Sequence, residues 1–292
     1  MTKIHIAVLL FALPILAENA PEDSVIDSFP GKFSLQFHSR YNYASLSGES
    51  TDDENFATNR PIDIGLGGGY GDFTWSSLVT VSFGADSKKP KTRATDWDLN
   101  YFGDRFFWNL FLKVNDGFYM KDVESGEFRK ADLFTFSAGF VVDYLWNGEH
   151  SLRAAYSLDR RQKKSNGSFV FGAGVYYHGI VSLDSLLPQY AKYQQFLHLG
   201  PNVGYSYTWV WQSGWFFNLL GVASTSFGKN LTRDQWMFFS QIFPKFSLGY
   251  HAEKWSIHFP FFVSALQISS DDGELSDIFF NASGGFMLTR RF

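Results

Sequence analysis

A dense cluster of positive charge is the part of the sequence best suited to chemistry. In DRRQKKSNGSFVFGAG, residues 159–174, four cations fall within five positions: Arg160, Arg161, Lys163 and Lys164. An alternating apolar run follows after a short polar break. Guanidinium and ammonium groups at this density can bind an anion, line a pore or lie on a solvated loop. Which of these applies depends on the elements that carry the cluster.

Alternation of apolar and polar residues, the period of a β-strand, runs through the chain on both sides of this cluster. Aromatic residues make up 19% of the sequence, with 33 Phe, which is more than one soluble core requires. The pattern predicts an all-β, transmembrane, antiparallel up-and-down β-barrel, with a secreted β-sandwich as the alternative. We count thirteen alternating segments, at 33–43, 62–66, 73–83, 97–101, 108–114, 134–146, 152–158, 169–177, 197–211, 215–223, 246–252, 255–265 and 278–292.

Tight turns and longer polar loops separate these segments in alternation. The turns carry Gly, Asn or charged pairs at 71–72, 103–104, 147–148, 213–214 and 253–254. The loops fall at 46–59, 85–93, 117–130, 229–234 and 269–276. Short periplasmic turns and long outer loops are typical of outer-membrane barrels. Four tryptophans at segment ends fit an interfacial girdle: Trp209, Trp211, Trp215 and Trp255.

The count of thirteen conflicts with the even strand number of single-chain barrels. We therefore expect twelve strands, with fourteen next. The turns place the conflict between residues 148 and 212, where three segments occur and parity needs two or four. We place the error within roughly 160–196, because SLDSLLPQYAKY resembles neither a strand nor a tight turn.

The N-terminal residues predict export. MTKIHIAVLLFALPILAENA has a positive start, an apolar run too short to span a bilayer and small residues after it. We expect a cleaved signal peptide at 1–17, a short periplasmic segment at 18–32 and the barrel at 33–292. The predicted location is the outer membrane of a Gram-negative-type bacterium. Phe292, on the apolar face of its segment, is the predicted insertion signal for the barrel-assembly machinery.

Composition and motifs exclude several other classes. No apolar run reaches the length of a transmembrane helix, and the chain has no Cys for disulfides or thiolate metal sites. A net charge of −4 argues against nucleic-acid binding. The acids at 271–274 lack calcium-loop spacing, so we predict no metal and no cofactor. His150-Ser151 and Ser256-Ile257-His258 have no nucleophile context, so we assign no catalytic residue.

Several pieces of the chain resemble one family of exported bacterial barrels, domain of unknown function 4421. They are IDIGLGGGYGDF, TDWDLNYFGDRFFWNLFLKVNDGFYMKD, SLRAAYSLDRRQKKSNGSFVFG and LGPNVGYSYTWVWQSGWFFNLL. RQKKSNGSF is the most specific piece, being similar to the family's Gln-Lys-Lys-Ser-x-Gly-Ser run, and Gly117–Tyr119 supports it. One departure is Phe134-Thr135 after Asp132-Leu133, where the family tends to carry an arginine. The resemblance covers roughly 33–292 and implies an outer-membrane barrel without an established activity.

Strand parity places the cation cluster inside the predicted barrel. If the segment 152–158 is a strand that continues, Arg161 and Lys163 face the lumen and pair with acids, chiefly Asp159 on the same strand and Asp96 and Asp98 across the lumen. Ser165 and Ser168 then satisfy backbone or carboxylate groups nearby. Two alternatives are a basic constriction that selects anions, and an outward pair, Arg160 and Lys164, on lipopolysaccharide phosphates. The lumenal charged belt that we predict comprises Arg153, Asp159, Arg161, Lys163, Ser165, Ser168, Asp96, Asp98, Arg40 and Lys113.

These features predict a narrow pore or structural barrel with a polar, charged lumen. We expect a monomer in contact with outer-membrane lipids. Two alternatives from other classes are a lipid- or lipid A-modifying enzyme and an adhesin or complex-forming barrel that acts through its loops.

Overall fold

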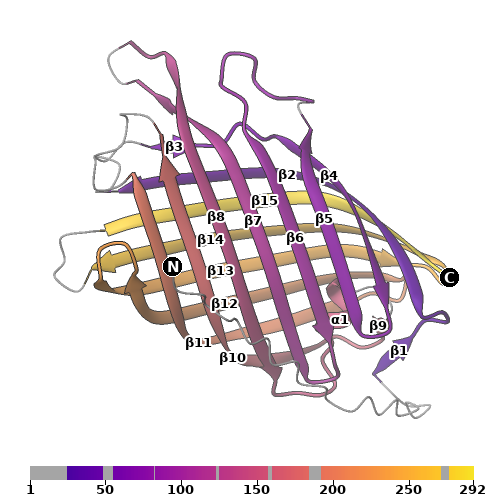
Figure 1. Cartoon of the computed structure of the whole chain (residues 1–292). Helices are drawn as coiled ribbons and strands as arrows, with labels where there is room; N and C mark the ends of the chain where they lie inside the picture. The colour runs from indigo at the N-terminus through magenta and orange to yellow at the C-terminus, as the bar shows by residue number, and fades with distance from the viewer. Residues whose placement is uncertain are drawn as a thin grey trace.

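The computed structural model describes residues 25–48, 55–81, 83–122, 125–156, 160–183, 192–270 and 276–292 (Figure 1). Twelve antiparallel strands form a closed ring, in which each strand pairs with its neighbours in the chain and the last pairs with the first. They are β2 (Phe33–Gly48), β4 (Ile62–Tyr70), β5 (Phe73–Val81), β6 (Arg93–Phe102), β7 (Phe106–Lys121), β8 (Phe128–Leu145), β10 (Asn166–Ser182), β11 (Tyr193–Val210), β12 (Trp215–Asn230), β13 (Gln235–His251), β14 (Trp255–Ser270) and β15 (Ser276–Arg291).

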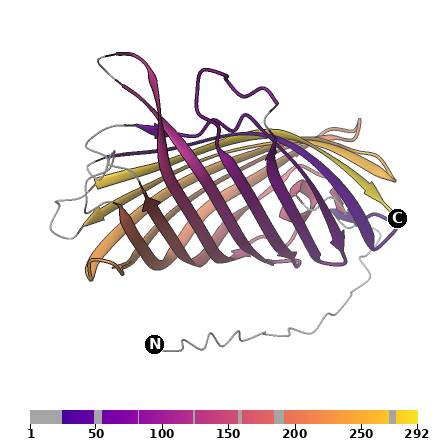
Figure 2. The same cartoon turned by 45° about the horizontal axis from the view of Figure 1, so that its top comes forward.

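The ring closes through a long register between β15 and β2, from Asp277 opposite Gly48 to Arg291 opposite Ser34. Closure leaves the sheet without a free edge, which is what a strand needs inside a bilayer. The expected twelve-stranded up-and-down barrel is confirmed. In Figure 2 the strands follow one another around the ring, and the β7–β8 hairpin rises beyond its neighbours.

Side chains on the outer surface of the ring are predominantly apolar. Large apolar residues remain exposed on nearly every strand, and among them are Phe37, Leu66, Val79, Leu110, Phe171, Val203, Ile242 and Leu288. Their neighbours along the strands, such as Gln36, Asn202 and Thr289, are buried in the lumen. The four girdle tryptophans are also exposed, at the end of the barrel with the short turns. A closed antiparallel barrel with this outer surface spans an outer membrane through its strands.

Among the described residues, no helix has the length and apolar character needed to cross a membrane.

The wall differs between the two ends of the barrel. Strands β4, β5 and β6 have only 9, 9 and 10 residues, and they pair with the turn-end halves of β2 and β7. Beyond them a two-residue strand, β3 (Phe56–Ala57), pairs with both β2 and β7. At the loop end, β3 takes the place of β4, β5 and β6, so that ten of the described strands form the wall there. Because barrel diameter grows with strand number, the loop end is narrower.

The predicted strand at 152–158 is wrong. Residues Leu152–Tyr156 form a short helix, α1, whose Leu152, Ala154 and Ala155 are buried. Seven residues, about two helical turns, are too few to separate strand alternation from a helix, and Leu, Arg and Ala favour a helix. The surplus segment therefore lies before 160–196, and not within it as we expected. Of SLDSLLPQYAKY, residues 184–191 lie outside the described residues, as do the predicted signal peptide and acids 271–274.

Candidate functional site in the barrel lumen

The loop end of the lumen is filled by apolar side chains. They come from strands all around the ring, and several are fully buried. We call this cluster the outer seal: Leu46, Phe56, Phe118, Met120, Ala131, Leu133, Ile180, Phe196, Met237, Phe239, Leu266 and Ile268. The narrower wall at this end lets side chains from opposite strands meet. Packed apolar residues of this kind exclude water from the lumen.

The turn end of the lumen is filled by α1. Leu152 of α1 packs with Leu145, Val170, Leu220 and Val222 of the strands. Strand side chains also satisfy the carbonyls of the helix, since His251 Nε2 lies 3.1 Å from Ala154 O and Ser247 Oγ donates to Ala155 O at 3.2 Å. We call α1 and these partners the inner plug.

Arg153 fixes the inner plug to two periplasmic turns. Its guanidinium is buried, pairs with Asp72, and donates to Gly71 O at 2.7 Å and Phe102 O at 3.1 Å. These partners belong to the β4–β5 turn and the end of β6. Arg153, which we predicted to face the lumen from a strand, instead belongs to α1 and holds this helix in place.

His150, just before α1, is a buried part of the same region. Its Nε2 lies 2.8 Å from Ser206 Oγ, and burial lowers the pKa of the imidazole to about 4. The ring is therefore neutral at neutral pH.

The cation cluster lies outside the main barrel sheet, which corrects our expectation. Strand β9 (Arg160–Gln162) pairs only with β1 (Ile26–Ser28), in a separate two-stranded sheet at the turn end. Asp27 of β1 takes ion pairs from Arg161 and Lys163, both at 3.1 Å. The predicted pairing of these cations with Asp96 and Asp98 is wrong, because the helix turns the chain out of the wall before the cluster begins.

Asp27 is strongly tied to these cations. Burial raises the pKa of its carboxyl, but hydrogen bonds from Lys163 and Arg161 outweigh burial and hold the pKa below its ordinary value. Phe29 follows in the chain and lies under the guanidinium of Arg291, 3.8 Å from the ring centroid. The N-terminal strand is therefore docked on the turn end of the barrel. Within the cluster, Arg161 and Lys163 are the cations that anchor β1.

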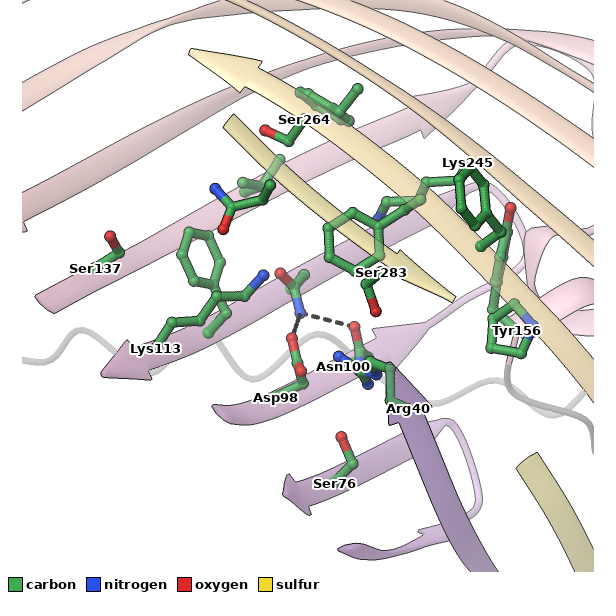
Figure 3. A pocket seen from close by; sticks show the side chains of 18 of the residues that line it. Arg40, Ser76, Asp98, Asn100, Lys113, Ser137, Tyr156, Lys245, Ser264 and Ser283 are labelled. Carbon is green, nitrogen blue, oxygen red and sulfur yellow. Dashed lines mark hydrogen bonds between the residues drawn. The ribbon is translucent and has the colours of Figure 1, made fainter. Parts of the chain in front are cut away.

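A cavity of about 370 Å³ lies between the outer seal and the inner plug. Its lining includes Phe118 and Leu266 of the seal and Leu152 and Tyr156 of the plug. Between these two apolar ends the wall of the cavity combines charged and polar side chains with aromatic rings (Figure 3). We call this cavity the chamber. Its charged lining residues are Arg40, Asp98, Lys113, Asp143 and Lys245.

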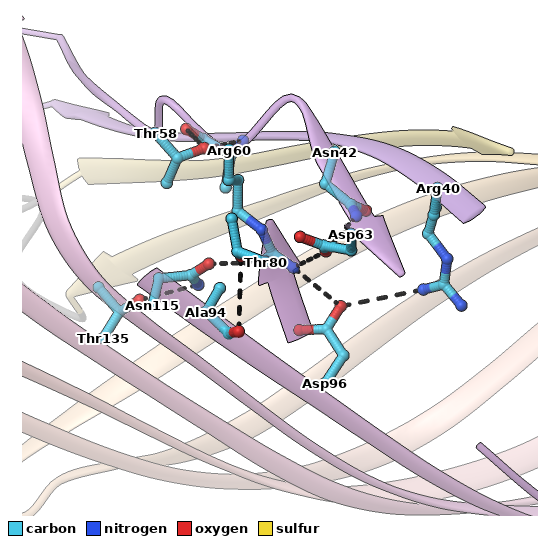
Figure 4. A network of polar contacts seen from close by, with 11 residues as sticks. Arg40, Asn42, Thr58, Arg60, Asp63, Thr80, Ala94, Asp96, Asn115 and Thr135 are labelled. Carbon is cyan, nitrogen blue, oxygen red and sulfur yellow. Dashed lines mark hydrogen bonds and ion pairs between the residues drawn. The ribbon is translucent and has the colours of Figure 1, made fainter. Parts of the chain in front are cut away.

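A buried ionic network lies beside the chamber (Figure 4). Arg60, from the segment between β3 and β4, pairs with Asp63, lies 3.4 Å from Asp96, and donates to Asn115 Oδ1 at 2.6 Å. Arg40 reaches Asp96 from the chamber side at 3.9 Å. The network fixes the segment 58–61, which continues the wall above the short strands.

The structure separates the predicted belt into different places. Arg40, Asp96, Asp98 and Lys113 lie in the lumen, as expected. Ser165 Oγ accepts from Val210 N at 3.0 Å and Ser168 Oγ from Asn147 N at 3.0 Å, both at the turn end. Asp159 lies outside the described residues. Phe292 is exposed on the outer surface, with its N–H donated to Phe33 O at 2.9 Å; its role in insertion stays a prediction.

Two lumenal cations, Lys245 and Arg60, were not predicted from the sequence. Lys245 follows Pro244, where the apolar alternation is interrupted, so the predicted segment began at Phe246. Arg60 lies next to the predicted loop 46–59, which carries no periodic signal. Because Phe246 is on the apolar, outward side of its strand, strand alternation would have placed the preceding residue, Lys245, on the lumenal face. Among the described residues, no group of three or more His, Cys, Asp or Glu is placed to hold a metal ion.

Three solved structures of low similarity share the general barrel form. The outer membrane protease OmpT of Escherichia coli is 5% identical, with 91% of this chain and 98% of that chain covered and a TM-score of 0.37. The toluene transporter TodX of P. putida is 5% identical (90% and 91%, TM-score 0.31). OmpT of Vibrio cholerae is 7% identical (89% and 98%, TM-score 0.30). At this similarity nothing about their activities transfers to this chain.

No curated protein sequence matches the chain. The sequence profile of one family does match it, over residues 22–285, which is most of the chain and includes every strand of the barrel except the end of β15. The resemblance carried by RQKKSNGSF is thereby confirmed. The chain belongs to the family described as Domain of unknown function (DUF4421).

Proposed function

We propose that this outer-membrane barrel is a gated passage, closed at both ends around a chamber that holds a small solute. The observation that carries the proposal is the position of the chamber, between the outer seal and the inner plug. About eight strands make a barrel that side chains can fill, so a ring of twelve leaves interior space that the outer seal and the inner plug close at its two ends. A cavity of about 370 Å³ with a charged wall is of the size that holds a small ligand.

The outer seal supports a gate in preference to a permanent pore. Phe56, Phe196 and Phe239 are fully buried in it, from β3, β11 and β13. Hydrophobic constrictions stop ion flow because they exclude water, and they conduct when their side chains move apart or are removed. Neither lipid modification nor loop-mediated adhesion is favoured by a specific feature of the described residues.

Planar-bilayer recording tests the proposal. The wild-type protein should give little steady conductance, whereas the double variant Phe196→Ala/Phe239→Ala should open long-lived channels. Phe238→Ala is the matched control, because Phe238 precedes Phe239 on β13 and is exposed on the outer surface. That variant should stay closed.

Folding of each variant is checked by heat-modifiability on gels, since each buried Phe→Ala change costs about 3–5 kcal/mol. If the double variant does not fold, Phe239→Ala alone takes its place. A wild-type protein that conducts steadily, or a folded seal variant that stays closed, would show that the outer seal is not a gate.

A further inference from the structure

Three cations enter the chamber from different strands. Figure 3 shows Arg40 of β2, Lys113 of β7 and Lys245 of β13 with their side chains directed into the cavity. Within the described part of the chain, neither lysine forms an ion pair. Arg40 has one, at 3.9 Å from Asp96, an acid that lies closer to Arg60. An ammonium group in a confined space without a carboxylate partner is costly unless water or a ligand satisfies it.

The acids of the chamber do not neutralise these lysines by contact. Asp98 and Asp143 line the cavity, and within the described residues neither forms an ion pair with Lys113 or Lys245. Asp98 accepts a hydrogen bond from Asn109 Nδ2 at 3.4 Å (Figure 3). Three cations and two carboxylates therefore face the same space. Because Lys113 and Lys245 have no carboxylate in contact within the described residues, an anion that reaches both ammonium groups supplies the missing partner.

The rest of the wall suits an apolar body. Lys113 Nζ lies 4.9 Å from the ring centroid of Phe262 and 5.8 Å from that of Phe111. Phe243 and Phe279, on the inward faces of β13 and β15, also line the cavity. Pockets that combine aromatic walls with a few charged groups orient amphipathic ligands, because the rings take the apolar part and the charges fix the polar end.

We infer that the chamber binds a small amphipathic anion, a carboxylate with an aromatic body, whose charge is met by Lys113 and Lys245. The inference deepens the proposed function and rests on it in one respect, since the ligand reaches the chamber only when a seal opens.

The test compares three probes of one shape: 4-phenylbutyrate, 4-phenylbutanol and 4-phenylbutylamine. Binding to the detergent-solubilised full chain is measured by calorimetry, with the wild type and with Phe196→Ala/Phe239→Ala, whose chamber is open. The carboxylate should bind at least tenfold more tightly than the alcohol, and the amine should bind most weakly. Equal binding of the three probes, or no binding of the carboxylate to either protein, would overturn the inference.

Substitution of the lysines assigns the site. Lys113→Gln and Lys245→Gln should each weaken binding of the carboxylate at least tenfold and leave the alcohol unchanged. Lys254→Gln, in the exposed β13–β14 turn, is the control and should bind like the parent. Heat-modifiability confirms that each variant is folded, and Lys→Met replaces Lys→Gln where it is not. Folded variants that bind the carboxylate as the parent does would also overturn the inference.

Reversal potentials separate this inference from the proposed function. Channels of Phe196→Ala/Phe239→Ala should prefer anions in a salt gradient, and Lys113→Gln in the same background should shift the preference towards cations. Open channels without such a shift would leave the gate intact and refute the anion site. Lysine-dependent binding of the carboxylate, together with seal variants that never conduct, would support the anion site and refute the gate.

Discussion

Replacing Arg153 with Ala should release α1 from the turn end of the barrel. The guanidinium is buried, pairs with Asp72 and donates to two backbone carbonyls, Gly71 O and Phe102 O. Hydrogen bonds from a charged group contribute about 1.5–3 kcal/mol each, and breaking a buried ion pair costs about 3–5 kcal/mol. Asp72 is partly exposed and can be rehydrated, so the lower end applies. We expect a loss of about 3 kcal/mol.

Arg160→Ala is the matched control for this change. Arg160 also pairs with an aspartate, Asp104, at 2.6 Å, but that carboxylate is 75% exposed. Exposed ion pairs contribute about 0–1 kcal/mol, so this variant should unfold almost as the wild type does. Urea unfolding in lipid vesicles, followed by tryptophan fluorescence, measures both variants, and Asp72→Ala completes a double-mutant cycle. Equal stability of the two arginine variants would refute the role of Arg153 in holding the inner plug.

Three further predictions concern other regions of the molecule. Burial lowers the pKa of His150 from 6.5 to about 4. The neutral ring therefore stabilises the fold fully above pH 6.5, and about 3 kcal/mol of the unfolding free energy is lost as pH falls towards 4. His150→Asn should flatten the pH dependence of urea unfolding between these two values, and an unchanged dependence would contradict the pKa shift. Arg60→Met should leave the buried carboxylate of Asp63 without its ion pair and lower the unfolding free energy in the same assay by about 3–5 kcal/mol. Adding Asp63→Asn should recover part of this loss. If Arg60→Met alone has no effect, the network does not fix the wall. Deletion of Phe292 should reduce assembly in cells, measured as the heat-modifiable fraction, far more than Arg290→Ala does, whereas normal assembly without Phe292 would remove the insertion signal.

The strands could be predicted from the sequence because lipid and lumen impose opposite chemistry on alternate residues. Phe37 and Gln36, or Val203 and Asn202, are neighbours in the chain and lie on opposite faces of the wall. The same reasoning failed at Leu152–Tyr156, because a helix inside the lumen is apolar towards the wall and has no lipid face to reveal its period. Because this helix was taken for a strand, its alternation placed Arg161 and Lys163 in the lumen.

The chamber could be predicted only in part. Arg40, Asp98 and Lys113 lie within regular alternation and were placed correctly on the lumenal face. Lys245 and Arg60 were missed because a proline and a loop interrupt the period next to them. The empty space itself depends on how far side chains from opposite strands reach. That distance follows from strand number and from the shortness of β4, β5 and β6, which no local pattern encodes.

Asp96 offers one oxygen to two arginines. Its Oδ2 is the atom that lies 3.4 Å from Arg60 and 3.9 Å from Arg40. Arg60 belongs to the segment that continues the wall above the short strands, and Arg40 belongs to the chamber. Because both guanidiniums interact with one oxygen, a group that draws Arg40 away from Asp96 changes the interaction of Asp96 with Arg60, and by linkage a change in that interaction alters the binding of the group by the same free energy. Through this single atom, the contents of the lumen and the firmness of the wall are thermodynamically linked.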